Sequence, residues 1–141
     1  DGRMDIQTQG LKPFKLLNFE NPIPQKLYAG GEVEFLEIIN QDNFLLRQKV
    51  IELIKVLYNT LRINLASNFD NVAYLSYEFA HKIGLSFEQQ YELLQMENEE
   101  DRQSYILEHL EHSIPLVEEI ERTKDLIRMN GHFRNYTPLD F

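Results

Sequence analysis

Glycine and proline are crowded into one end of this chain, and that asymmetry limits the architectures it can adopt. Of the eleven Gly and Pro residues, seven lie before residue 32 and four lie after it. Because Gly and Pro mark turns and interrupt regular structure, short elements are expected first and longer ones afterwards. The sequence therefore predicts two lobes, a β-rich lobe over residues 1–40 and a helical lobe over residues 41–141.

Acidic residues are concentrated in the second part of the chain. Residues 1–70 contain 8 basic and 9 acidic residues, whereas residues 71–141 contain 6 and 14. The formal net charge of −9 repels phosphate groups, so neither nucleic acid nor a membrane is expected as a partner. With 43% apolar residues the chain can build a core, and it contains no Cys. A cytoplasmic location is the simplest expectation.

Three segments of the first lobe have the alternating pattern of half-buried strands. They are Met4–Gln9, Phe14–Phe19 and Val33–Ile38. The connection Asn21–Pro24 contains two prolines and is expected to be extended, and the pair Gly30–Gly31 is typical of a bulge or a tight bend. Because the connections are short, the three strands are expected to be mostly antiparallel.

The second lobe is predicted to be helical throughout. One helix is expected from Asp42, its N-cap, to Ile63, and another from about Asn71 to Ile83, where Gly84 ends it. A Ser-x-x-Gln capping box at residues 86–89 predicts a short helix to about Met96.

A long helix is predicted from about Glu99 to Asn130. The positions along one side of this helix, mostly apolar but including a Ser and a Lys, step by four and three residues, close to a heptad pattern: Ile106, Leu110, Ser113, Val117, Ile120, Lys124 and Ile127. Pro115 interrupts the hydrogen bonding of the helix, but the pattern continues in phase, which favours one kinked helix over two. Gly131 is expected to close the helix, followed by an irregular tail with Phe133, Tyr136 and Phe141.

Signatures of catalysis and of cofactor binding are missing from this sequence. It has no phosphate-binding glycine loop and no nucleophile elbow. His109 and His112 are three residues apart on the long helix, but this is not the spacing of zinc hydrolases, and such pairs are common on solvated acidic helices. The acidic run from Glu97 to Asp101 fits the first turn of a helix better than a calcium loop. We therefore expect no enzyme activity, no metal and no cofactor.

The aromatic residues of the first lobe carry more information. Phe14, Phe19, Tyr28 and Phe35 lie in or beside the predicted strands. They either form a small core or line an exposed apolar groove that holds extended polypeptide. Which of the four face outward does not follow from the sequence.

Several segments resemble the amino-terminal, substrate-binding domain of Lon protease. Residues 5–17, DIQTQGLKPFKLL, look like its strand–glycine–loop–strand unit, and residues 28–36, YAGGEVEFL, look like the next strand. AHKIGLS at residues 80–86 and QQYELLQM at residues 89–96 are similar to its helical part, where a short helix precedes a long one. The resemblance covers nearly the whole chain.

The resemblance implies an α+β fold, in which an antiparallel β-rich lobe, part of a PUA-like pseudo-barrel, precedes an α-helical bundle with one long C-terminal helix. It implies recognition of protein substrates for degradation, with an ATP-dependent protease as a further partner. The ATPase and Ser-Lys protease modules have no counterpart here, so proteolysis belongs to another chain. The family's domain starts with further strands, so these residues are expected either to be part of a longer polypeptide or to pair with a second copy.

Three hypotheses follow, from different classes of function. The leading one is a non-catalytic domain that binds unfolded or partner polypeptide through Phe14, Phe19, Tyr28 and Phe35 in protein quality control. The second is a structural module that self-associates, as a homodimer, through the long helix. The third is a metal hydrolase built on His109 and His112.

Overall fold

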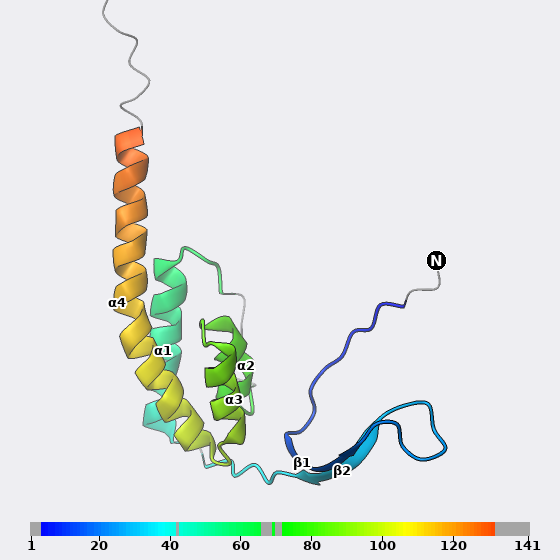
Figure 1. Ribbon diagram of the computed structural model, residues 1–141. Coiled ribbons are helices and arrows are strands. Elements are labelled where there is room, and N and C mark those ends of the chain that lie inside the picture. Colours follow the sequence, from blue (N-terminus) through cyan, green and yellow to red (C-terminus); the bar gives the residue numbers. More distant parts are fainter. Residues whose placement is uncertain (1–3, 42, 66–68, 70–71, 132–141) are drawn as a thin grey trace, which may run out of the picture. The chain divides into compact units, whose positions relative to one another are not determined.

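The computed structural model describes residues 4–41, 43–65, 69 and 72–131 of this α+β protein. Two strands come first and the helices follow (Figure 1). The chain forms two compact units, Asp1–Ile39 and Asn40–Phe141. In chain order the elements are β1 Phe14–Glu20, β2 Gly30–Phe35, α1 Phe44–Thr60, α2 Leu75–Phe79, the 3₁₀ turn η1 Ala80–Lys82, α3 Phe87–Gln95 and α4 Glu99–Gly131. The predicted α+β class, with a long C-terminal helix, is confirmed.

The first unit contains an antiparallel hairpin of β1 and β2. Phe14 pairs with Phe35 at one end of the ladder, and Glu20 pairs with Gly30 at the other. The connection between the strands is held by two backbone hydrogen bonds: Ile23 N–H donates to the Tyr28 carbonyl at 3.1 Å, and Lys26 N–H donates to the Ile23 carbonyl at 2.9 Å.

The prediction of a third strand over Met4–Gln9 is wrong. These residues are extended but belong to no ladder, and Met4 and Ile6 are 83% and 78% exposed. An alternating pattern describes a strand's two faces, but a strand also needs a neighbour for its backbone hydrogen bonds. Within the described residues 4–39, β1 and β2 pair only with each other, so the segment has no such neighbour.

Helix α1 begins one residue later than predicted. Its N-cap is Asn43, whose side-chain oxygen accepts a hydrogen bond from the Leu46 amide at 3.3 Å. Asp42, the expected cap, lies outside the described residues. Val50, Ile54 and Leu57, spaced by four and three residues, form the buried side of α1.

The helix predicted over Asn71–Ile83 is shorter than expected. Regular helix starts only at Leu75, because Tyr74 is extended and the Val72 carbonyl accepts a hydrogen bond from the Arg47 guanidinium at 2.8 Å. Because Arg47 belongs to α1, this hydrogen bond holds Val72 against α1, and Val72 is not part of a helix. The chain then tightens into η1 and turns at Gly84, whose φ of +83° is a conformation that favours glycine. The predicted end of the helix at Gly84 is therefore confirmed.

The remaining two helices agree with the sequence predictions. Ser86 and Gln89 form the expected capping box at the start of α3. Helix α4 continues through Pro115 as one element, and Figure 1 shows that its axis bends along its length. The predicted aromatic tail after Gly131 lies outside the described residues.

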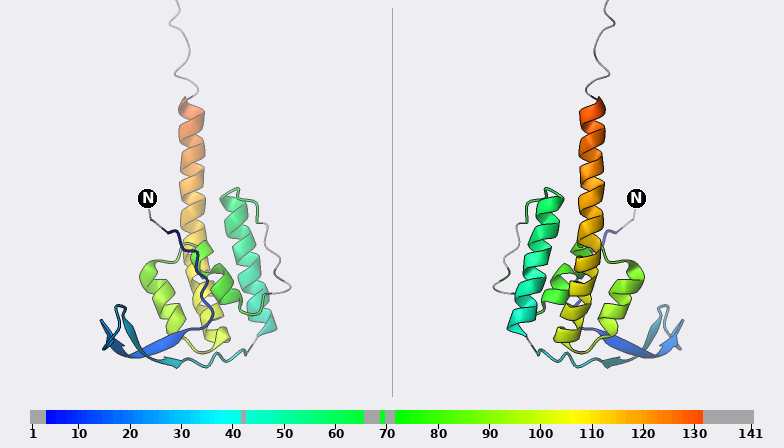
Figure 2. Two further views of the ribbon diagram at one scale, coloured as in Figure 1. Left: turned by 90° about the vertical axis from the view of Figure 1, so that its right-hand side faces the viewer. Right: turned by 90° about the vertical axis from the view of Figure 1, so that its left-hand side faces the viewer.

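All buried apolar residues among the described residues belong to the second unit. Helices α1 and α4 run side by side, and α2, η1 and α3 pack beside them (Figures 1 and 2). The Arg62 guanidinium pairs with the Asp125 carboxylate near the end of α1. The core consists of Val50, Ile51, Ile54, Leu57, Leu75, Phe79, Ala80, Ile83, Leu85, Leu93, Ile106, Leu110 and Ile114.

Candidate functional site

A β-bulge places three apolar side chains of β1 on one face of the hairpin. Leu16 pairs with Val33 and Asn18 pairs with Glu32, so Leu17 is an extra residue in β1. Side chains alternate along a regular strand, and one extra residue shifts that alternation by one. Phe19 therefore lies on the same face as Phe14 and Leu16, whereas regular alternation would place it on the opposite face.

The two faces of the hairpin consequently differ in chemistry. Val33 and Phe35 of β2 complete the side that carries Phe14, Leu16 and Phe19, and we call these five residues the apolar face. The residues that the ladder pairs on the opposite face are all polar, whereas Leu17, the bulge residue, is unpaired: they are Lys15, Asn18, Glu20, Glu32 and Glu34. The hairpin is thus amphipathic.

The apolar face is open. Phe14, Phe19 and Phe35 are 53%, 60% and 61% exposed. The rings of Phe14 and Phe35 meet edge to face, with centroids 6.4 Å apart, an arrangement that aromatic pairs prefer. The three phenylalanines form a patch, not a core.

Tyr28 lies apart from this ladder, in the connection between the strands. Its ring is 58% exposed and has the Lys26 ammonium 5.2 Å from its centroid. The structure therefore brings three of the four predicted residues onto one sheet face and leaves Tyr28 in the loop.

Gly31 permits the close approach of the two strands. A Cβ atom at this position would lie 2.2 Å from the Asn18 carbonyl oxygen, which is closer than two nonbonded atoms can approach. The same Cβ would lie 3.1 Å from Cδ1 of Leu16, on the side of the apolar face. The Gly30–Gly31 pair thus lies across from Glu20 and Phe19, next to the β1 bulge, and a side chain at position 31 would force the two strands to shift.

A second exposed apolar surface lies on α3. Phe87 and Tyr91 are 80% and 58% exposed, and together with Leu94 they border a shallow depression that reaches Ala80 and His81. This surface belongs to the helical unit, so it provides a matched comparison for the apolar face.

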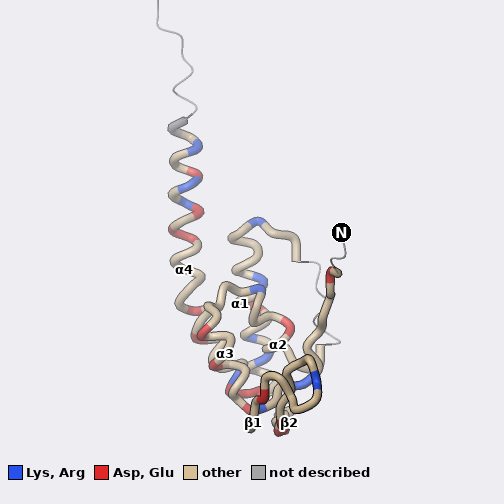
Figure 3. Tube along the Cα trace, turned by 45° about the vertical axis from the view of Figure 1, so that its right-hand side comes forward, with Lys and Arg blue, Asp and Glu red and all other residues tan. Residues whose placement is uncertain are grey.

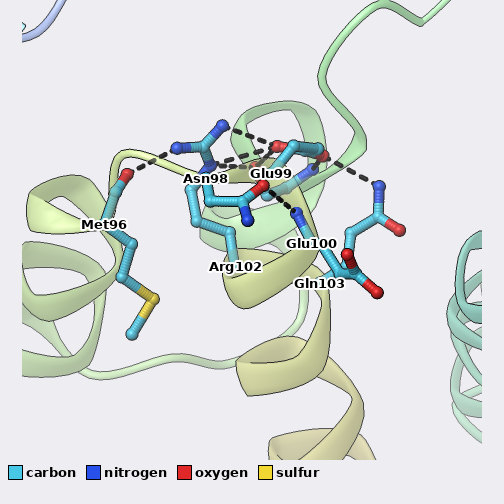
Figure 4. Close-up of polar contacts among 7 residues, drawn as sticks. Met96, Asn98, Glu99, Glu100, Arg102 and Gln103 are labelled. Carbon is cyan, nitrogen blue, oxygen red and sulfur yellow. Dashed lines mark hydrogen bonds and ion pairs between the residues drawn. The ribbon is translucent and has the colours of Figure 1, made fainter. Parts of the chain in front are cut away.

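The helical unit also contains a buried ion pair that the sequence did not reveal. Glu99 and Arg102 are both fully buried, and Nη2 of Arg102 lies 2.9 Å from Oε2 of Glu99 (Figure 4). The Ser76 amide and hydroxyl donate to the Glu99 carboxylate at 3.1 and 2.6 Å, and Gln103 donates at 3.1 Å. Arg102 also donates to the Met96 carbonyl. The network ties α2 to the start of α4.

Tyr77 lies over this network. Its ring centroid is 4.5 Å from Cζ of Arg102, a cation–π contact. Burial raises the pKa of the Tyr77 phenol, and the positive charge of Arg102 partly opposes this shift. The sequence contains one signal of the network, the i,i+3 spacing of Glu99 and Arg102, whereas the acidic run by itself predicts only helix capping. That interpretation is incomplete, because the Glu99 carboxylate is buried, accepts hydrogen bonds from Ser76 and forms an ion pair with Arg102.

The two histidines of α4 have separate partners. Nε2 of His109 lies 3.1 Å from the Ile83 carbonyl, and Nδ1 of His112 lies 3.4 Å from the Glu108 carbonyl. Within the part of the chain that the structure describes, no three His, Cys, Asp or Glu residues are grouped closely enough to hold a metal ion.

The chain belongs to a known family of domains. The family described as the ATP-dependent protease La (LON) substrate-binding domain matches residues 1–112. Membership in this family supports a substrate-binding role, and the substrate-binding domain is a non-catalytic module of Lon. A search of curated proteins and a search of solved structures found no match. None of the described helices combines the length and the apolar character needed to cross a bilayer.

Proposed function

We propose that this chain binds unfolded polypeptide on the apolar face of its β1–β2 hairpin, as a non-catalytic receptor in cytoplasmic protein quality control. The bound chain would then pass to an ATP-dependent protease. The two units act as separate domains in this proposal, with the boundary near residue 40. The observation that carries the proposal is the alignment of Phe14, Phe19 and Phe35 on one exposed sheet face by the bulge at Leu17.

The chemistry of this face suits an unfolded ligand. Unfolded proteins differ from folded ones by exposing apolar and aromatic side chains, and burial of such surface contributes about 25 cal/mol per Å². The aromatic rings are rigid and lose little conformational entropy when they are covered. A flat patch without charged groups can accept many sequences, as a receptor for diverse substrates requires.

The strand edges offer a second mode of contact. Within the described residues 4–39 no third strand joins the hairpin, so β1 and β2 each keep one edge open. An extended peptide can add to such an edge through backbone hydrogen bonds, which do not depend on sequence. Backbone pairing at an edge and side-chain contact on the apolar face would act together.

The test uses a reduced and alkylated globular protein that cannot refold, labelled with a fluorophore. Binding of the intact chain is followed by fluorescence anisotropy. Replacement of Phe14, Phe19 and Phe35 by Ser is expected to weaken binding at least about tenfold, as loss of a central aromatic cluster does at other interfaces. Tyr28→Ser, tested separately, measures the contribution of the loop.

The matched control is the double variant Phe87→Ser/Tyr91→Ser, which removes two exposed aromatic rings from α3. It is expected to leave binding unchanged, because these rings lie on the helical unit. Unchanged binding after replacement of all four predicted residues would exclude the hairpin. Loss of binding in the control variant alone would move the site to α3.

A further inference from the structure

One face of α4 changes its surroundings halfway along the helix. Starting at Glu99, the positions that step by three and four residues form a continuous stripe: Glu99, Arg102, Ile106, His109, Ser113, Leu116, Ile120, Thr123 and Ile127. This is the spacing of the a and d positions of a coiled coil. In heptad notation Ile106, Ile120 and Ile127 occupy a positions, and Leu116 and Thr123 occupy d positions.

The first half of the stripe is covered by the chain itself. Arg102 contacts the Met96 carbonyl and the Tyr77 ring, and Ile106 is fully buried. His109 contacts the Ile83 carbonyl, next to η1. Helix α2, the residue after η1 and the C-cap of α3 therefore occupy the position that a partner helix takes in a coiled coil.

The second half of the same stripe is uncovered. Leu116, Ile120 and Ile127 are 62%, 53% and 66% exposed. Both views of Figure 2 show α4 continuing past the end of α1. The chain just after α1 meets this half of α4 on another side, because Arg62 pairs with Asp125, which is not a stripe position.

We propose that a second copy of this chain covers the exposed stripe, so that the two α4 helices pair in parallel and in register from Leu116 to Ile127. The inference goes beyond the proposed function, because it concerns a different surface and a different partner. It gives the self-association hypothesis a defined geometry. The exposed half of the stripe, from Leu116 to Ile127, has the same heptad phase as the half that packs within the chain. The same mode of helix packing can therefore extend along the whole of α4.

Charge complementarity selects a second copy as the occupant and selects the parallel direction. Glu119 occupies the g position that precedes Ile120, and Lys124 occupies the e position of the next heptad. In a parallel dimer a g residue faces the e residue five positions later in the partner, so Glu119 faces Lys124 of the partner subunit on both sides. Figure 3 shows basic and acidic positions interspersed over this end of α4. Within one chain Lys124 pairs with Glu121 at 2.6 Å, but its side chain is 61% exposed and can turn to a new partner.

The residues at the a positions agree with two strands. Ile at a positions combined with Leu at d positions favours two strands, and the exposed stripe has Ile120 and Ile127 at a and Leu116 at d. Thr123 at the d position between them weakens the pairing. The dimer is therefore expected to be reversible and to depend on concentration.

The first experiment is sedimentation equilibrium of the full chain over a roughly 100-fold concentration range, where mass action moves a reversible dimer from mostly dissociated to mostly associated. Ile120→Asp/Ile127→Asp is expected to raise the dimer dissociation constant more than tenfold. The control Met129→Asp removes an equally exposed apolar side chain from a c position and is expected to have no effect. Circular dichroism of each variant checks that the helical unit is folded.

Charge reversal tests the pairing across the interface. Glu119→Lys and Lys124→Glu are each expected to weaken the dimer, since each places like charges opposite one another. The double variant is expected to restore it, because the pair is then inverted. A dimer that is insensitive to all of these changes, or a chain that stays monomeric at every concentration, overturns the proposal.

The direction of the helices is tested by cross-linking, which is unambiguous because the chain contains no Cys. Leu116→Cys and Thr123→Cys, made separately, are both expected to form a disulfide-linked dimer on mild oxidation. Arg122→Cys, at a c position, is the control that stays unlinked. In an antiparallel dimer a residue lies beside its own copy only at the two-fold axis, so at most one of positions 116 and 123 could cross-link. Cross-linking of only one position would therefore contradict the parallel arrangement.

Binding of the unfolded probe by Ile120→Asp/Ile127→Asp tests the proposed function separately.

Discussion

The two units of this chain use their apolar residues in opposite ways. Among the described residues of the helical unit thirteen apolar side chains are buried, and a fully buried ion pair with its hydrogen-bond partners joins α2 to α4. In the hairpin unit none of the described residues 4–39 is buried, although this segment contains five aromatic or aliphatic residues on one sheet face. The first unit has a core, and the second has an apolar surface.

This difference separates stability from binding. A two-stranded hairpin without a packed face is marginal in water, whereas a helical bundle with a continuous core is stable by itself. The phenylalanines of the hairpin therefore contribute little to folding in this structure and remain available to another molecule. Side chains of the same type should therefore give different results in the two units, which the matched changes at Phe79 and Phe35 test.

The largest effect is expected for Phe79→Ala. Phe79 is fully buried, and its ring stacks on Phe69 with centroids 5.0 Å apart. Removal of a buried Phe side chain leaves a cavity and costs about 4 kcal/mol of unfolding free energy. Urea unfolding followed by helical circular dichroism measures the loss.

The matched change is Phe35→Ala in the hairpin. Because its ring is 61% exposed, it is expected to alter the unfolding free energy of the helical unit by less than about 0.5 kcal/mol. Similar losses at Phe79 and Phe35 would show that the two units share one core, and the comparison would fail.

The next effect in size is expected for Arg102→Ala, which leaves the Glu99 carboxylate buried without its cation. Breaking a buried pair from one side costs about 3 kcal/mol or more. Ser76 still donates two hydrogen bonds to the carboxylate, so the lower end of that range is expected. The double variant Glu99→Gln/Arg102→Met, which removes both charges, should lose less than Arg102→Ala in the same urea unfolding. An equal or larger loss in the double variant would contradict this account.

The helices were the most predictable part of the fold. The capping box at Ser86, the end of α2–η1 at Gly84 and the continuation of α4 through Pro115 all follow from local chemistry that neighbouring residues supply. The two errors have long-range causes. The non-helical position of Val72 is held by Arg47, 25 residues away, and Met4–Gln9 lacks a strand to pair with.

The candidate site was predictable in its residues but not in its geometry. The sequence singled out Phe14, Phe19 and Phe35, yet regular alternation would separate Phe19 from Phe14. Only the register of β1 against β2 reveals the bulge at Leu17 that brings the residues together. The buried network of Ser76 and Glu99 was missed for a similar reason, since its partners are 23 residues apart.

The smallest effect on global stability, and the most local one, is expected for Gly31→Ala. The new methyl group would meet the Asn18 carbonyl at 2.2 Å, so the strands must separate or shift register near the bulge. A shift of one residue turns Phe19 away from the apolar face. Cross-strand NMR contacts between β1 and β2 are expected to disappear, binding of the unfolded probe to fall, and the unfolding free energy of the helical unit to change by less than about 0.5 kcal/mol. Because Gly31→Ala removes no aromatic ring, a loss of binding would assign recognition to the arrangement of the phenylalanines as well as to their number. Intact pairing of Phe19 with residue 31 in this variant would show that the close approach of the strands does not require glycine.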